Sequence, residues 1–365
     1  MLNTKDQKNL LEIKDAVLAW FFENHKNYSF RNNRTPYRVW ISEVLLQQTR
    51  MGAALQKIEK FLDTFPDLQS LAEASEEQVL TSFKGLGYYN RARNLHKGAK
   101  LLMTHYDSFP ARYTELIHIP SIGEYTAAAI ASICFGEHIP VIDGNIKRIY
   151  ARLFEINYRI NKKDFIIHLK QMLDYIFALK KNNPGDINEA FMQFGQIVCK
   201  PKNPECSKCV IKDKCKAYFH RTTKLYPVTE KSILKKDVKW KIYFLVHEKS
   251  VLINKYQDFF LLNTHNGFPS VIEMEDEVIF SATGDVFKNY LRHHRTQKFF
   301  AGPRHTITHY KIKFEFCVTH LKEKDQLGDN VYWHPVNVTD NLLISSGLLK
   351  TWRQALDTHI ARGGT

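Results

Sequence analysis

The fold of this 365-residue chain is decided by a stretch in its first half, where residues 116–127 read LIHIPSIGEYTA. A short helix ends at the Pro-x-x-Gly turn, and an alanine-rich helix begins immediately after Gly123. Such a turn points the first backbone N–H groups of the second helix outward, where they and the helix dipole can hold a phosphate without reading base sequence. An ordinary helical hairpin fits the same segment, so the motifs on either side must decide between the two.

Helical periodicity covers the first 225 residues. Near the N-terminus, apolar residues recur at spacings of three and four, as on one face of an amphipathic helix: Leu10, Ile13, Val17 and Phe21. Thr35 and Pro36 are typical of a helix start, and the apolar stripe after them continues to Leu62 as one pattern. The other predicted helices cover residues 76–83, 90–105, 124–135, 145–154, 164–180 and 187–198.

The composition changes near residue 225. Residues 226–238 are rich in lysine and show little periodicity, so they are interpreted as a basic linker. Beyond them the period shortens to that of strands, over residues 241–246, 251–254, 311–319 and 331–334, and residues 312–316 alternate strictly. The sequence therefore predicts a helical domain (1–225), a linker (226–238) and a smaller α+β domain (239–358).

The chain is strongly basic, with 52 Lys and Arg against 38 Asp and Glu and a formal net charge of +14. This charge favours a polyanionic partner, with nucleic acid the first interpretation and an anionic membrane surface the second. No stretch approaches the ~18 apolar residues of a membrane span, and the charged N-terminus lacks the apolar run of a signal peptide. We therefore expect an intracellular protein, cytoplasmic and nucleoid-associated if bacterial, with no part in a membrane.

Four cysteines follow the spacing Cys199-x6-Cys206-x2-Cys209-x5-Cys215. Four thiolates this close together can surround one tetrahedral metal ion or one cubane cluster, and ligand type alone leaves zinc and iron–sulfur both open. Two disulfides or free thiols are the alternative. The loop also carries several lysines, which suggests a phosphate contact. The remaining two cysteines, Cys134 and Cys317, lie in apolar runs and are interpreted as core residues.

Two acidic residues lie in apolar surroundings. Asp143 follows the run IPVI and precedes a helix, where an aspartate commonly serves as an N-cap. Glu43 has Val39, Trp40 and Leu46 among its helical neighbours, which would raise its pKa and suit it to be a general acid. The alternative for Glu43 is a solvated helix glutamate.

A further segment, GLGYYNRAR at residues 85–93, places glycines and tyrosines ahead of a basic helix. Tyrosines beside arginines can wedge into a base stack, and packing of one tyrosine in the core is the alternative.

Taken in order from about residue 31 to 220, these segments resemble the MutY family of adenine DNA glycosylases, which belongs with endonuclease III to the helix-hairpin-helix glycosylases. The segments that carry the resemblance are TPYRVWISEVLLQQTR, GLGYYNRARNLH, the hairpin, VIDGNIKR, NEAFMQFG and the four-cysteine spacing. The resemblance implies a mostly α helix-hairpin-helix glycosylase domain with an iron–sulfur cluster loop (199–215), followed by a smaller α+β MutT-like domain that recognises 8-oxoguanine. It also implies a four-iron, four-sulfur (4Fe-4S) cluster in preference to zinc.

The function implied is base excision repair: a monomer binds double-stranded DNA containing adenine opposite 8-oxoguanine, or opposite guanine, and hydrolyses the N-glycosidic bond of the adenine. The resemblance assigns catalytic roles to Glu43 (general acid), Asp143 (stabiliser of the sugar cation), Tyr125 and Asn145. It assigns substrate contacts to Arg31, Gln48, Tyr88, Glu189, Thr308 and His309, a DNA phosphate to Gly123, and the cluster to Cys199, Cys206, Cys209 and Cys215.

Departures from the family pattern qualify these expectations. Tyr125 stands where the lyases of the superfamily carry a Schiff-base lysine, which indicates a glycosylase without an efficient strand-cutting step. Ser121 replaces the usual glycine, and we expect this to be tolerated at negative φ. Ile307 replaces a phenylalanine beside Thr308 and His309, which puts the 8-oxoguanine preference in question. The rivals are a related glycosylase for another base and a DNA-binding iron–sulfur protein that has lost catalysis.

Overall fold

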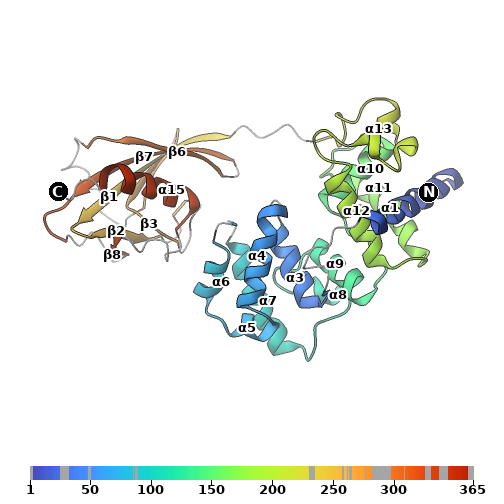
Figure 1. Ribbon diagram of the computed structural model, residues 1–365, viewed down its shortest axis with the longest axis horizontal. Helices are drawn as coiled ribbons and strands as arrows, with labels where there is room; N and C mark the ends of the chain where they lie inside the picture. The colour runs from blue at the N-terminus through green and yellow to red at the C-terminus, as the bar shows by residue number, and fades with distance from the viewer. Residues whose placement is uncertain are drawn as a thin grey trace. The chain divides into compact units, whose positions relative to one another are not determined.

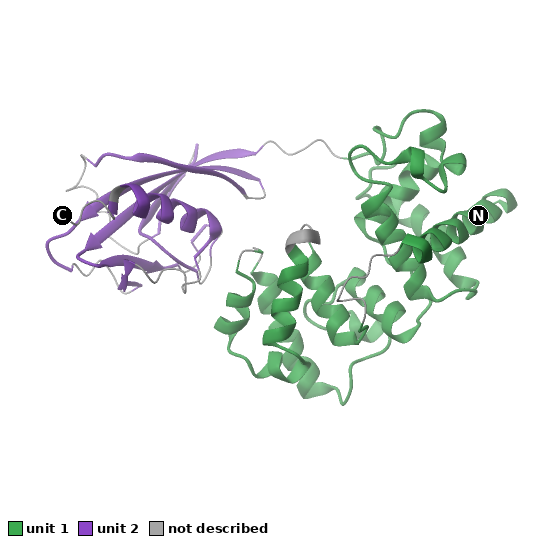
Figure 2. Ribbon diagram, in the orientation of Figure 1, with its two compact units in different colours: residues 1–231 green, residues 232–365 purple. Residues whose placement is uncertain are grey.

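The computed structural model describes residues 3–24, 33–47, 51–84, 86, 89–229, 235–256, 259–260, 262, 265–275, 277–281, 297–307, 309–324, 330–336 and 344–360. The chain divides into two compact units, Met1–Lys231 and Ser232–Thr365 (Figure 1; Figure 2). Within these described ranges, no helix has both the length and the apolar character needed to cross a membrane.

The first unit is helical throughout its described part (Figure 1). Its α-helices are α1 (Thr4–Asn24), α3 (Pro36–Leu46), α4 (Met51–Thr64), α5 (Leu68–Glu73), α6 (Glu76–Ser82), α7 (Asn90–His105), α8 (Tyr113–Leu116), α9 (Glu124–Phe135), α10 (Gly144–Phe154), α11 (Lys163–Ala178), α12 (Pro184–Ile197) and α13 (Lys216–Phe219). Two 3₁₀ turns, η1 (Cys206–Lys208) and η2 (Lys212–Lys214), lie in the cysteine loop. The predicted helices over 90–105 and 124–135 have the observed bounds of α7 and α9.

Side-chain caps explain where several of these helices start. The Thr35 hydroxyl accepts a hydrogen bond from the Arg38 N–H, and Pro36 occupies the first turn of α3. The prediction of one helix from Pro36 to Leu62 is wrong. The helix ends at Leu46 because Gln47 has ψ 125°, an extended backbone that cannot continue the helical hydrogen bonds.

One apolar core of this unit lies between α1 and the helices α9 to α12. Leu10, Ile13 and Val17 from α1 are at most 1% exposed, which confirms the predicted amphipathic face. Each such side chain stabilises the fold by roughly 1.5–3 kcal/mol through removal of apolar surface from water. This packing holds α10 and α12 rigidly, and both helices carry predicted site residues.

The second unit is a mixed sheet with one helix described against it (Figure 2). Its elements are β1 (Lys236–His247), β2 (Ser250–Lys255), β3 (Asn266–Gly267), β4 (Ser270–Glu273), β5 (Val278–Phe280), β6 (Phe300–Ile307), β7 (Tyr310–His320), β8 (Val331–Pro335), α15 (Ser346–Ala355) and the short π-helix η4 (Leu356–Ile360). Strand β1 pairs antiparallel with β2 and β4 and parallel with β7. Strand β6 pairs antiparallel with β7, and β8 pairs antiparallel with β2.

Alternation along β1 buries side chains on both faces of the sheet. Trp240 and Phe244 pack on the face that α15 covers, where the rings of Phe244 and Trp352 lie 5.0 Å apart. Tyr243 and Leu245 belong to a second apolar cluster, which includes Cys317. The predicted core position of Cys317 is thereby confirmed, while Cys134 is only half-buried at the end of α9.

The predicted basic linker is shorter in the structure than in the sequence interpretation. The carbonyl of Tyr226 accepts a hydrogen bond from Arg152, and that of Val228 accepts one from the Ile160 N–H, so this stretch is tied to the helical unit. At the other end, residues 236–238 already belong to β1. These interactions are long-range in sequence, and the lysine content gave no sign of them.

Candidate active site

The hairpin between α8 and α9 leaves the N-terminus of α9 open. The turn is closed by its own backbone, with the Ile122 N–H donating to the Ile119 carbonyl at 2.9 Å. Gly123 is the N-cap and provides no side-chain acceptor to α9. A Cβ at this exposed glycine would meet no atom within 4 Å. The positive end of α9 therefore faces open space, which suits an anion.

The expectation that Ser121 keeps a negative φ is wrong. Its φ is 69°, in the left-handed region that glycine adopts freely and that a residue with a Cβ adopts at a cost of about 1–2 kcal/mol. The Ser121 hydroxyl accepts a hydrogen bond from Nε1 of Trp40 in α3, at 2.9 Å. This bond gives the serine a partner that a glycine could not have.

Glu43 lies inside the protein, on α3. The residue is 6% exposed, which excludes the alternative of a solvated glutamate. The hydroxyl of Tyr125, from the first turn of α9, donates a hydrogen bond to its Oε2. One turn further along α3, Nε2 of Gln47 donates to the hydroxyl of Thr126 at 3.3 Å. The hairpin thus places Tyr125 directly against the predicted general acid.

Asp143 is the N-cap of α10, as its position before the helix indicates. Its Oδ1 accepts from the Ile146 N–H at 2.7 Å, and its Oδ2 accepts from Nδ2 of Asn145 at 2.6 Å. Burial of the carboxyl group raises the pKa of Asp143 above the 3.8 of an ordinary aspartate, although these hydrogen bonds and the nearby Arg148 oppose the shift. The capping role and a chemical role are therefore compatible.

Arg148 joins this site to the cysteine loop. Its Nη2 donates to Oδ1 of Asn145 at 2.8 Å and to the Gly195 carbonyl at 2.8 Å, while its Nε donates to the Cys199 carbonyl at 2.7 Å. Gly195 is required here, because a Cβ would lie 2.5 Å from Cβ of Asn145. A continuous chain of hydrogen bonds therefore runs from Asp143 through Asn145 and Arg148 to the first cysteine of the loop.

Glu189, on α12, is 4% exposed and paired with a cation. Nη2 of Arg34 lies 2.7 Å from its Oε2, and Nη1 of Arg34 lies 3.2 Å from Oδ1 of Asp186. The preceding Asn188 is fully buried and accepts from the Val141 N–H at 2.9 Å. That bond anchors the segment that leads to Asp143, so α12 supports two of the predicted site residues.

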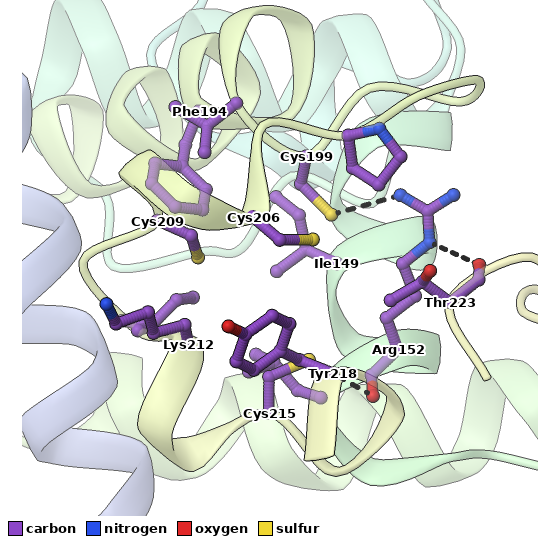
Figure 3. Close-up of a pocket in the computed structure, with 14 residues that line it drawn as sticks. Ile149, Arg152, Phe194, Cys199, Cys206, Cys209, Lys212, Cys215, Tyr218 and Thr223 are labelled. Atoms are coloured by element: carbon purple, nitrogen blue, oxygen red, sulfur yellow. Dashed lines mark hydrogen bonds between the residues drawn. The ribbon is translucent and has the colours of Figure 1, made fainter. Parts of the chain in front are cut away.

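The four clustered cysteines line one pocket. Figure 3 shows their sulfur atoms directed into a common space beside Phe194 and Arg152. All four thiols are free, which excludes the two disulfides considered from the sequence. In the described part of the chain, no group of three or more His, Cys, Asp or Glu side chains is arranged to hold a single metal ion.

The pocket is largely apolar, and two cationic residues, Arg152 and Lys212, also line it. Burial raises the pKa of the Cys209 thiol to about 12 and that of Cys215 to about 11. Nη1 of Arg152 lies 3.4 Å from Sγ of Cys199, and its Nε donates to the Thr223 carbonyl at 3.1 Å (Figure 3). The same guanidinium donates to the carbonyls of Lys200 and Pro201. Four soft ligands in an apolar pocket, with a cation to offset their charge, fit an iron–sulfur cluster.

Comparison with known proteins decides the family. Over 266 residues the chain is 32% identical to the adenine DNA glycosylase of Buchnera aphidicola subsp. Acyrthosiphon pisum, across 72% of this chain and 75% of that protein. The chain belongs to the adenine DNA glycosylase family. The family predicted from the sequence motifs is thereby confirmed, and so is the enzyme class, a DNA glycosylase.

Further comparisons agree with the assignment of this chain to the adenine DNA glycosylase family. Residues 41–193 match the HhH-GPD superfamily of base excision DNA repair proteins. The enzyme of Buchnera aphidicola subsp. Schizaphis graminum is 35% identical over 217 residues, which cover 59% of this chain and 62% of that relative. A thermostable thymine-DNA glycosylase has a similar fold, with a TM-score of 0.52 and 24% identity over 58% of this chain and 98% of that one. The predicted helix-hairpin-helix fold, followed by a smaller α+β domain, is confirmed.

Several predicted contacts of this family lie outside the described residues, namely Arg31, Gln48, Tyr88 and Thr308. His309 is described: it is exposed in the turn between β6 and β7, and its carbonyl accepts from the Lys236 N–H at 2.8 Å. The structure therefore brings together Glu43 with Tyr125 and Asp143 with Asn145.

Sequence reasoning missed the arginines of this adenine DNA glycosylase site. Asn145, Arg148 and Arg152 lie three and four residues apart, so they share one face of α10. Arginines that recur at helical spacing after Asp143 and Asn145 were the available signal. Their partners are 47–51 residues away for most of these bonds, and nothing in the local pattern names them.

Proposed function

We propose that this adenine DNA glycosylase is monofunctional and excises adenine opposite 8-oxoguanine, and more weakly opposite guanine, by hydrolysis of the N-glycosidic bond. The observation that carries this proposal is the buried Glu43 carboxyl group beside the Tyr125 hydroxyl. A carboxyl group in such surroundings can hold a proton for transfer to a base, and the neighbouring position provides no amine nucleophile.

Glu43 acts as the general acid. It donates its proton to a ring nitrogen of the flipped adenine, so the base departs neutral when the bond between that base and the sugar C1′ breaks. The electron pair of this bond goes to the adenine. The sugar is left as an oxocarbenium-like cation, which requires a separate source of negative charge.

Asp143 provides that charge. Its carboxylate faces the developing cation, and the hydrogen bonds from Asn145 and the Ile146 N–H hold both oxygens in place. Water then adds its oxygen to C1′, and its proton passes to a carboxylate of the site. Two carboxyl groups with divided roles are the general solution for cleavage at an anomeric carbon.

The rate should fall in acid, because Asp143 must be charged to stabilise the cation. The pKa of Asp143 is raised by burial, so the decline should begin at a higher pH than the 3.8 of an ordinary aspartate would give. Single-turnover rates across the acid range measure this limb. A rate that stays constant until the pH reaches the pKa of an ordinary aspartate would contradict the role of Asp143.

Tyr125 determines what remains after the base has left. A lysine at this position would attack C1′ and form a Schiff base that leads to strand cleavage. The tyrosine instead donates its hydrogen bond to Glu43. The proposed product is therefore an intact strand with an abasic site.

DNA phosphate contacts are proposed for the open end of α9 at Gly123 and for the exposed loop lysines Lys202 and Lys208.

The adenine must leave the base stack before it can be cleaved. Base flipping costs a few kcal/mol and is assisted at a mismatch. Wedge roles for Gln48 and Tyr88 and a pocket role for Arg31 rest on the motif match. The Glu189 carboxylate, held by Arg34, is proposed to accept from the adenine amino group.

Recognition of 8-oxoguanine is proposed for the second unit, which we assign to the MutT-like domain of the family. Thr308 would provide a hydroxyl and His309 an imidazole to the lesion. The exposed position of His309 at the tip of the β6–β7 hairpin is compatible with such a contact.

A four-iron, four-sulfur cluster is proposed to be held by Cys199, Cys206, Cys209 and Cys215. When bound, such a cluster would cross-link the four cysteines of the loop to one another, while Arg148 and Arg152 of α10 hold the loop by hydrogen bonds. The protein should absorb light at about 400 nm, and iron analysis should find about four iron atoms per chain. Cys206→Ala should lose both, whereas Cys317→Ala, a buried cysteine outside the pocket, should keep them. Stoichiometric zinc without iron would refute the cluster.

The opposite-base preference tests the proposed substrate. Single-turnover assays would compare three duplexes, with adenine opposite 8-oxoguanine, adenine opposite guanine, and thymine glycol opposite adenine. We expect the fastest release from the first, slower release from the second and none from the third. Activity on the third duplex alone would support the rival glycosylase for another base, and binding without any release would support a non-catalytic DNA-binding protein.

A further inference from the structure

Polar side-chain contacts at three described positions join the hairpin to helix α3 and its C-cap Gln47. Trp40 Nε1 donates to the Ser121 hydroxyl at 2.9 Å, the Tyr125 hydroxyl donates to Glu43, and Gln47 Nε2 donates to the Thr126 hydroxyl at 3.3 Å. Trp40 and Glu43 are three residues apart and share one face of α3, and Gln47 follows four residues later as its C-cap. The proposed general acid is the middle contact of the three.

The outer contact at Ser121 lies in the turn itself. Ser121 is two residues before Gly123, the N-cap of the helix end proposed to hold a DNA phosphate. Trp40 is 0% exposed and lies one helical turn before Glu43 on α3. The bond between them therefore connects the turn that would hold the DNA to the helix that carries the acid.

The backbone of Ser121 is strained, which indicates that the residue is kept for its side chain. A φ of 69° is uncommon for a residue with a Cβ, and glycine would occupy the same conformation without strain. Backbone strain of this kind persists where surrounding interactions determine the conformation, and it is concentrated at functional sites. The hydrogen bond from the buried indole is such an interaction.

We propose that Ser121 is a positioning residue: by accepting the Trp40 hydrogen bond, it sets the place of the Glu43 carboxyl group relative to Tyr125 and to the DNA held by the hairpin. This inference rests on the proposed function of Glu43. A small displacement of a reacting group lowers the rate far more than it lowers binding. Ser121 should therefore influence the chemical step while leaving affinity for the duplex nearly unchanged.

Two substitutions separate the bond from the strain. Ser121→Ala removes the hydroxyl and keeps the Cβ, whereas Ser121→Gly removes both and relieves the backbone. Each should slow single-turnover adenine release by about 3- to 10-fold, the effect of one neutral hydrogen bond. The alkaline limb of the pH–rate profile, where a general acid loses its proton, should also move. Ser121→Gly should be more thermostable than Ser121→Ala, because it also relieves the backbone, so an equal slowing of both variants cannot be explained by lost folding.

A double-mutant cycle tests whether the effect passes through Trp40. In a Trp40→Phe background, Ser121→Ala should have no further effect on rate. Ser82→Ala provides a matched control, because it removes a serine hydroxyl that donates to the Val79 carbonyl within α6. This control should keep the wild-type rate and pH profile.

The Trp40 indole N–H resonance provides a readout that does not depend on activity. It should be assigned by its loss in Trp40→Phe and should shift in both Ser121 variants. A shifted resonance together with a wild-type rate and pH profile in Ser121→Gly would overturn the positioning role, and an unshifted resonance would overturn the bond itself. If the wild-type enzyme released no adenine, the proposed function would fail, while the resonance would still report on the bond.

Discussion

Glu43→Gln is expected to slow adenine release by about 10²–10⁴-fold, the usual contribution of a positioned general acid. Glutamine keeps the length of the side chain and an oxygen that can accept the Tyr125 hydrogen bond, but its amide has no acidic proton to transfer to the base. Because only the proton is lost, the variant should bind the duplex as tightly as the wild type. Single-turnover kinetics and a binding isotherm on the same duplex would measure the two effects separately.

The matched control is Glu77→Gln, which makes the same change at an exposed position in the first turn of α6. It should leave the rate unchanged. A Glu43→Gln enzyme with full activity would remove Glu43 as the acid. A variant that lost duplex binding along with activity would indicate that Glu43 maintains the structure of the site.

Asp143→Asn is expected to lower the rate by about 10²–10³-fold, the typical cost of removing one electrostatic stabiliser of a transition state. Asparagine is as good an N-cap as aspartate, so the bond to the Ile146 N–H can persist. The bond from Asn145 is lost, because two amide N–H groups would then face each other.

The stability of this variant distinguishes a catalytic role from a capping role. A carboxyl group whose pKa is raised in the folded state binds its proton more tightly there than in the unfolded chain. Its ionised form therefore destabilises the fold above that pKa, and stability rises as the pH falls through it. Removing the charge offsets the lost hydrogen bond, so at neutral pH the free energy of unfolding should change by no more than about 1 kcal/mol.

Asp164→Asn, in the exposed first turn of α11, is the control and should not affect the rate. An Asp143→Asn protein that loses activity only in proportion to its loss of folded protein would identify Asp143 as a cap alone.

Local patterns predicted the helices whose ends are marked by local chemistry. Gly123 and Gly136 cap the two ends of α9, and Thr35 with Pro36 starts α3. The break after Leu46 has no such mark, since the residues on both sides continue the same apolar stripe. It became visible only through the extended backbone of Gln47.

Site residues were predictable where the residue type and its position in a motif indicate the chemistry directly. Glu43, Asp143 and the four cysteines stand out by type and spacing. The partners that position them do not, because Arg148 reaches Gly195 and Cys199 across 47 and 51 residues. Ser121 shows the same limit, since its type gave no indication that its backbone would adopt a φ of 69° or that its hydroxyl would meet Trp40.

The central claim is adenine removal by Glu43 acting with Asp143 and without an amine nucleophile. It is tested most directly by identifying both products of one turnover on a duplex with adenine opposite 8-oxoguanine. The account predicts free adenine and an intact abasic strand that breaks only after alkali, with no protein–DNA adduct trapped by borohydride. Absence of free adenine, or an efficiently trapped Schiff-base adduct, would contradict it.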